Sequence, residues 1–168
     1  QMFDSASSFN QNIGSWNTSS VETMEAMFRY AESFNQPIGG WNTASVTNMI
    51  DMFSHAYAFN HPIGDWNTGA VKNMELMFQN TGVFNQDISG WNTAAVTEMD
   101  SMFSGASAFN QDITGWSSAS LTSSTSMFLS ATAWLARYKN TVTSGSNDGP
   151  SSNWLGPGPF TTKSALDT

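Results

Sequence analysis

One ten-residue segment recurs along this chain of 168 residues, and each occurrence starts 25 residues after the one before it. The copies read FNQNIGSWNT from Phe9, FNQPIGGWNT from Phe34, FNHPIGDWNT from Phe59, FNQDISGWNT from Phe84 and FNQDITGWSS from Phe109. No insertion or deletion interrupts the period. A fixed period of this length is typical of proteins in which each repeat stacks on its predecessor. The sequence therefore predicts a solenoid.

A second repeated segment predicts a helix in every repeat. In VETMEAMFRYA, residues 21–31, the apolar residues follow one another at spacings of three, three, one and three. The same pattern recurs from Val46, Val71 and Val96. This spacing places the apolar side chains on one face of an α-helix. Thr18 and Ser19 are candidate N-caps, so we expect a helix of about three turns, with methionine as core filling.

The segment from Phe9 to Trp16 predicts a short strand followed by a turn, because it holds Phe, Ile and Trp next to glycine. Stacked copies would pair these strands in parallel, about 4.8 Å apart. Pro37 and Pro62 lie inside the segment and cannot donate to a ladder, so the pairing must be brief. The predicted fold class is therefore α/β, a solenoid with one short parallel strand and one short helix per 25-residue repeat.

Equivalent residues of successive repeats form columns, and two polar columns of the predicted strand are candidate ligand-binding residues. Alternation along a strand places the asparagine column on one side and the glutamine column on the other. The glutamine column faces the core, where stacked amides can bond along the stack, or faces solvent if the strand bends; the sequence leaves both open. The columns are Asn10, Asn35, Asn60, Asn85 and Asn110, and Gln11, Gln36, His61, Gln86 and Gln111.

A tryptophan column has a structural and a functional interpretation. We expect a buried aromatic stack in which each indole N–H finds a backbone acceptor. The alternative is an exposed row of rings that binds sugars. The column is Trp16, Trp41, Trp66, Trp91 and Trp116.

The two ends of the chain depart from the repeat. Residues 1–139 are predicted to form the solenoid, five copies followed by a capping helix from Leu121 to Lys139, and residues 140–168 a tail rich in Ser, Gly and Pro. The chain opens partway through a repeat, which would leave apolar surface bare unless upstream repeats or another molecule cover it. The candidate self-association residues are Met2, Phe3, Trp154, Leu155 and Phe160.

Composition argues against several functions. The net charge is −8 and the five basic residues are scattered, whereas nucleic-acid binding needs a basic stripe. Cysteine is absent, and no apolar run approaches the roughly 20 residues of a membrane span. His61 is expected to replace a glutamine in hydrogen bonding, and His55 to be solvated. We therefore expect no enzymatic activity, no cofactor and no metal. The alternative for a metal is a calcium ion shared by Asp87 and Asp112. Asn17 begins the one N-glycosylation triplet of the sequence.

The unit WNTxxVTxMxxMFxxAxxFNQxI, as in Trp41 to Ile63, resembles the BspA-like leucine-rich-repeat surface proteins in their variant rich in Met, Phe and Trp. The resemblance covers roughly residues 2 to 134. It implies a right-handed, leucine-rich-repeat-like solenoid, a location at the cell surface or outside the cell, and a role in adhesion or recognition. No catalytic residues come with this family.

Three functions remain open after these arguments. The first is a non-catalytic adhesion or recognition module with a protein or glycan ligand, since repetition suits extended ligands and multivalent contacts. The second is a structural subunit that stacks end to end into a filament. The third is ice binding by a flat threonine row. That row is Thr18, Thr43, Thr68 and Thr93.

Overall fold

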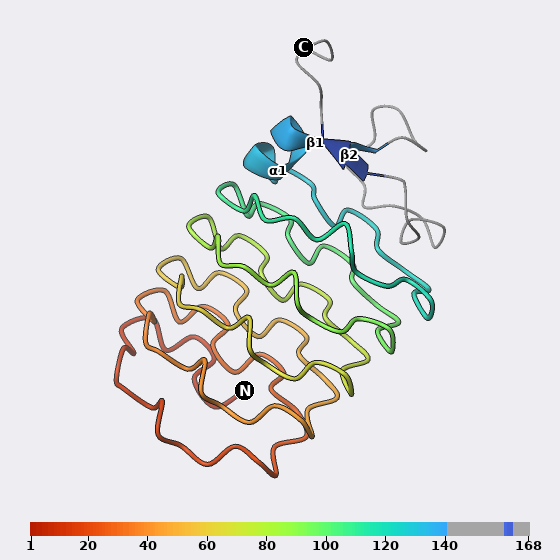
Figure 1. Cartoon of the computed structure of the whole chain (residues 1–168). Helices are drawn as coiled ribbons and strands as arrows, with labels where there is room; N and C mark the ends of the chain where they lie inside the picture. Colours follow the sequence, from red (N-terminus) through yellow and green to blue (C-terminus); the bar gives the residue numbers. More distant parts are fainter. Residues whose placement is uncertain (141–159, 163–168) are drawn as a thin grey trace.

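The repeats form a stack of coils, one coil for each 25 residues. The computed structural model describes residues 1–140 and 160–162. Figure 1 shows the coils following one another from the N-terminus to the short elements at the other end. No helix within these ranges has the length and apolar character needed to cross a bilayer.

The predicted α/β solenoid, leucine-rich-repeat-like with a strand and a helix in each repeat, is wrong. The described residues form one helix, α1 (Thr132–Arg137), and two strands, β1 (Tyr138–Asn140) and β2 (Phe160–Thr162). The two strands pair antiparallel, with Tyr138 opposite Thr162. All three elements follow the fifth copy, so the repeats themselves contain neither a strand nor a helix. Their parallel contacts are single bridges, the first between Thr23 and Asn48.

A chain of β-turns takes the place of the predicted helix. The N–H of Met27 donates to the carbonyl of Met24, and Ala31 donates to Phe28. The third residue of each turn, Ala26 or Tyr30, has a positive φ, as in a type II turn. Inward residues recur at about the spacing of a helix face, so periodicity alone cannot separate the two structures.

The turns leave alternate backbone N–H groups free to bond to the next coil. Met24 donates to the carbonyl of Asn48 at 2.9 Å, and Phe28 to that of Met52 at 2.9 Å. Ala26 and Tyr30 make the equivalent bonds, and the same set recurs in the later coils. A helix would have kept these donors for its own i→i−4 bonds. The coils are therefore joined by backbone as well as by side chains.

Rows of stacked phenylalanine rings fill the centre of the stack. In one row the ring centroids of Phe28 and Phe53 are 5.6 Å apart, and in the other those of Phe34 and Phe59 are 5.9 Å apart. The two rows also meet inside each coil, since Phe28 lies 3.9 Å from Phe34. Each of these rings is fully buried. Like side chains therefore lie on like side chains, with strongly favourable apolar burial at every step.

The tryptophan column is buried, which confirms its structural interpretation. The rings of Trp41 and Trp66 stack at 6.5 Å, and each is less than 5% exposed. The indole N–H of Trp41 donates to the carbonyl of Ile13 in the preceding coil at 3.1 Å, and the later members repeat this bond. Trp16 has no coil before it among the described residues and is 42% exposed.

The last coil is closed by a modified sixth copy. Trp134 lies 25 residues after Phe109, and Tyr138 lies 25 after Ile113. The Trp134 ring stacks on Phe128 at 3.8 Å and is fully buried, as the phenylalanines before it are. The predicted capping helix from Leu121 to Lys139 is thus too long, because residues 121–131 repeat the turns of earlier coils and only α1 is helical.

Two adjacent glycines allow a matched test of the coil spacing. A Cβ at Gly39 would lie 2.6 Å from the carbonyl oxygen of Pro62 in the next coil, whereas a Cβ at Gly40 would meet nothing within 4 Å. We expect Gly39→Ala to lower the free energy of unfolding by about 1 kcal/mol, at the low end for overpacking because Ser89 occupies the equivalent position in the fourth copy. Gly40→Ala is the control and should be neutral or slightly stabilising. Urea denaturation measures both, and equal effects would contradict this account of the close contact.

Candidate functional site

The asparagine column forms a hydrogen-bonded ladder along the stack. The side-chain oxygen of Asn10 accepts the backbone N–H of Asn35 at 2.9 Å, and Asn35, Asn60 and Asn85 do the same for the next copy. The ladder ends at Asn110, whose Oδ1 is buried without a hydrogen-bond partner among the described residues. The next copy has Leu135 within α1 in place of an asparagine.

The glutamine column lies beside this ladder and supports it. Gln86 donates its Nε2 to Oδ1 of Asn60 at 3.0 Å, and Gln36 and Gln111 bond to Asn10 and Asn85 in the same way. These side chains are half-buried, so the column neither enters the core nor projects freely. Gln11 is exposed in the first coil, and His61 is half-buried in the third. Both predicted columns come together on one edge, where much of their hydrogen-bonding capacity holds coil to coil.

The threonine row is internal. Thr43 is 1% exposed and its hydroxyl donates to the carbonyl of Asn67 in the next coil at 3.0 Å. Thr18, Thr68 and Thr93 make the equivalent bond. These residues are therefore not helix caps, and a buried row cannot present a flat face to ice.

Asp87 and Asp112 each close a local turn. Asp87 accepts the backbone N–H of Ser89 at 2.9 Å, and Asp112 accepts that of Thr114 at 3.0 Å. Hydrogen bonds from the same serine and threonine lower the pKa of the two carboxyls. Within the described ranges no three His, Asp or Glu side chains come together as a metal ligand set. The structure thus gives these aspartates a role in the turns.

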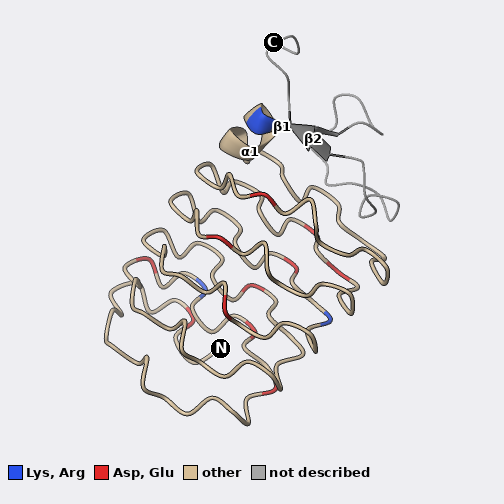
Figure 2. Cartoon of the chain, viewed as in Figure 1, with Lys and Arg blue, Asp and Glu red and all other residues tan. Residues whose placement is uncertain are grey.

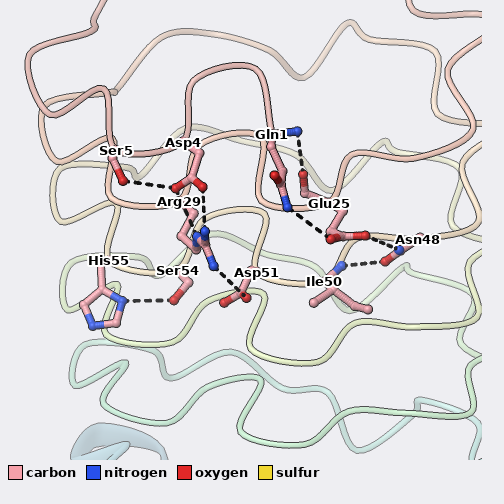
Figure 3. A network of polar contacts seen from close by, with 10 residues as sticks. All are labelled: Gln1, Asp4, Ser5, Glu25, Arg29, Asn48, Ile50, Asp51, Ser54 and His55. Atoms are coloured by element: carbon pink, nitrogen blue, oxygen red, sulfur yellow. Dashed lines mark hydrogen bonds and ion pairs between the residues drawn. The ribbon is translucent and has the colours of Figure 1, made fainter.

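A network of polar side chains joins the first three coils (Figure 3). Arg29 pairs with Asp4 of the coil before it and lies 3.8 Å from Asp51 of the coil after it. The hydrogen bond from Arg29 lowers the pKa of Asp4, while burial raises the pKa of Asp51. Among the charged residues of the stack, acidic ones outnumber basic ones (Figure 2). Arg29 is thus held between two carboxylates.

Next to this network lie three aromatic side chains that we call the aromatic patch: Tyr30, His55 and Tyr57. Tyr30 stacks on His55 with ring centroids 4.4 Å apart, and Tyr57 meets His55 edge-on at 5.9 Å. Tyr30 is 41% exposed and Tyr57 is 46% exposed. We expected His55 to be solvated, but it is half-buried, and burial lowers its pKa. The 25-residue spacing of Tyr30 and His55 was the signal that could have revealed their contact.

The imidazole of His55 is fixed by neighbours on both sides. Its Nδ1 lies 3.0 Å from the hydroxyl of Ser54, and its Nε2 lies 2.9 Å from Nδ2 of Asn80 in the next coil. Asp51 and Glu32 act in the opposite direction to burial, because their charges favour the protonated ring. The largest effect is burial, so the folded protein favours neutral His55.

The candidate self-association residues are only partly covered by the structure. Met2 is 66% exposed, and Phe3 is half-buried against Phe9, with ring centroids 3.8 Å apart. Trp154 and Leu155 lie outside the described residues, and Phe160 begins β2, where the backbone alone is described.

A shallow hollow of about 370 Å³ lies between the turns of the third and fourth copies. Pro62, Asp65, Gln86 and Asp87 are among its lining residues. It is open to solvent and belongs to the same edge as the asparagine ladder. Ser89 also lines it, but neither a histidine nor a lysine is among the lining residues to act as the base of a nucleophile.

The ladder generates a prediction with an internal control. Asn60→Ala removes the acceptor of the Asn85 N–H and of the Gln86 amide, so we expect a loss of about 1–2 kcal/mol in the free energy of unfolding. Asn110→Ala removes an oxygen that bonds to nothing in the described chain, so we expect it to cost much less. Chemical denaturation of the two variants checks the difference. Equal losses would show that the bonds along the ladder contribute little.

His55 generates a prediction about pH. Its folded pKa is lowered from the ordinary value of 6.5, so the unfolded chain binds a proton more readily. The stability due to neutral His55 is therefore present above about pH 6.5 and is lost as the pH falls through the lower folded pKa. Between pH 7.5 and pH 5 the wild-type chain should lose more stability than the His55→Asn variant. Asparagine is chosen because Asn80 occupies the equivalent position in the next coil. Urea denaturation at the two pH values measures both chains, and equal losses of stability would contradict the prediction.

Comparisons with known proteins place the chain in a family. The family model described as "Mycoplasma protein of unknown function, DUF285" matches twice, over residues 1–82 and 61–148. No curated protein and no solved structure matches the chain. The two matches together span the repeated part of the sequence and overlap at residues 61–82, within the third copy. The chain therefore belongs to the DUF285 family.

Proposed function

We propose that this chain is a non-catalytic recognition module that acts in adhesion or recognition at a cell surface or in secreted material. The observation that carries the proposal is the in-register stack, which displays equivalent side chains at a constant step of one coil. The asparagine and glutamine columns and the aromatic patch all lie on this rigid frame. Regularly spaced groups suit extended ligands and weak multivalent contacts.

The resemblance to the BspA-like surface proteins supports the location and the role in this proposal. The leucine-rich-repeat architecture that the resemblance implies is not part of the proposal, because turns take the place of a strand and a helix in each repeat. The proposed ligand is a protein or a glycan of another surface. The candidate contact residues remain the asparagine and glutamine columns, on the side that faces away from the core.

The test is binding of the full chain to a glycan array and to a panel of immobilised extracellular matrix proteins. We expect saturable binding to at least one of these classes, and tighter apparent binding for a chain dimerised through a fused tag, because avidity adds to weak sites. The chain unfolded in urea and returned to buffer without refolding serves as the control. Binding no stronger than that of this control across both panels would overturn the proposal.

A second candidate function is end-to-end stacking into a filament. It is favoured by the bonding between coils, which is the same at every step and does not close on itself. Light scattering and electron microscopy at high protein concentration test it. Growing particles with a repeat along one axis would support it, and a monodisperse monomer at all concentrations would exclude it.

A further inference from the structure

The aromatic patch and Glu32 together occupy the same two positions in each of two neighbouring coils. The second coil contributes Tyr30 and Glu32, and the third coil contributes His55 and Tyr57 at the equivalent positions. The backbone N–H of Ala58 donates to the carbonyl of Glu32 at 3.1 Å, which holds Glu32 directly beside Tyr57. Two exposed phenol rings, an imidazole and a carboxylate therefore share one small surface.

Small side chains flank this surface in the coils on either side. At the position of Tyr30 and His55 the first coil has Ser5 and the fourth has Asn80; at the position of Glu32 and Tyr57 they have Ser7 and Gly82. The described residues place no ring against Tyr30 other than His55. The face of Tyr30 toward Ser5 and the face of Tyr57 toward Gly82 are therefore bordered by small residues, in agreement with the large exposed fractions of the two tyrosines.

The charge around the patch selects among the groups that stack on tyrosine. Glu32 and Asp51 both act electrostatically on His55. Arg29 is held between Asp4 and Asp51, whereas Glu32 forms no ion pair among the described residues. The whole chain has 13 acidic against five basic residues. A ring face next to unpaired carboxylate charge attracts a cation, and a planar guanidinium combines stacking with the charge.

We propose that the aromatic patch binds arginine side chains of a protein partner, with one guanidinium on the open face of Tyr30 or Tyr57 and with Glu32 as its counter-charge. The inference rests on the proposed recognition function and names the partner class for one surface. It adds no catalytic step. Tyr30, Tyr57 and Glu32 contact the partner, and His55 is a positioning residue that holds Tyr30.

The two tyrosine substitutions used to test the patch should leave the fold intact, because each introduces a residue that the repeat already has at that position. Tyr30 has a φ of 55°, a conformation that asparagine tolerates well, and Asn80 occupies the same position two coils later with a φ of 57°. Tyr30→Asn should therefore fold with unchanged or greater stability. Tyr57→Ser introduces the residue found at Ser7 and Ser107 in the same column. Val83→Ser removes another exposed apolar side chain, 45% exposed, outside the patch, and is the matched control.

The experiment measures binding of the full chain to three probes by isothermal titration: a short peptide of alternating glycine and arginine, the same peptide with lysine, and a neutral chito-oligosaccharide. We expect the arginine peptide to bind more tightly than the lysine peptide, and binding to weaken as salt is added. The Tyr30→Asn, Tyr57→Ser double variant should bind the arginine peptide at least fivefold more weakly. Glu32→Gln should weaken it about two- to threefold, a size typical of an exposed charge pair, and Val83→Ser should bind as the wild type does.

Several results would overturn the inference. The double variant, once shown by urea denaturation to be folded, could bind the arginine peptide as well as the wild type, which would assign the affinity to the net negative charge alone. Equal affinity for the arginine and lysine peptides would exclude stacking, and preference for the saccharide through the same tyrosines would make the patch a glycan site. A surface ligand from the arrays that the double variant still binds would leave the recognition function in place and remove the patch from it.

Discussion

The structure depends on backbone hydrogen bonds that run between coils. Within each repeat, alternate N–H groups close β-turns and the others donate to the carbonyls of the following coil. Buried backbone N–H and C=O groups need hydrogen-bond partners, and this arrangement supplies them without a helix or a continuous strand. It also fixes the distance between coils, and the phenylalanine and tryptophan rings then stack at that distance. Core packing and the polar ladders are thus consequences of one repeated bonding pattern.

The sequence predicted the period and the inward residues but misassigned the backbone. Phe28, Phe34 and Trp41 are buried as expected, because a 25-residue period forces like side chains together. The helix was wrong because the spacing of Met24, Met27 and Phe28 suits a chain of turns as well as a helix face. Asn80 and Gly105, in a column where every member has a positive φ, were the available sign of turns. A backbone acceptor for the indole N–H of Trp41 was expected, but only the structure identifies it as the carbonyl of Ile13.

The candidate site was predictable in part for the same reason. Residues in one column could be expected to meet, and the asparagine and glutamine columns do meet on one edge. The hydrogen bonds between the two columns depend on the directions of the side chains. The alternation expected of a strand placed the columns on opposite sides, which was incorrect. The sixth copy was hidden because Trp134 and Tyr138 replace Phe and Ile and because α1 replaces the segment that contains Phe-Asn-Gln or Phe-Asn-His in earlier copies. The aromatic patch joins two columns, so it appears only when neighbouring coils are placed side by side.

The column that begins with Ser5 has a further consequence for how such a chain can change. Its backbone is left-handed in every described coil, yet its residues are Ser, Tyr, His, Asn, Gly and Ser. The frame imposes the conformation there and leaves the chemistry of the side chain open, in contrast to the invariant phenylalanines inside. Exchange or duplication of whole 25-residue units would therefore rewrite the outer surface while the interior stays the same, and new binding specificities would arise by shuffling coils rather than by redesigning a fold.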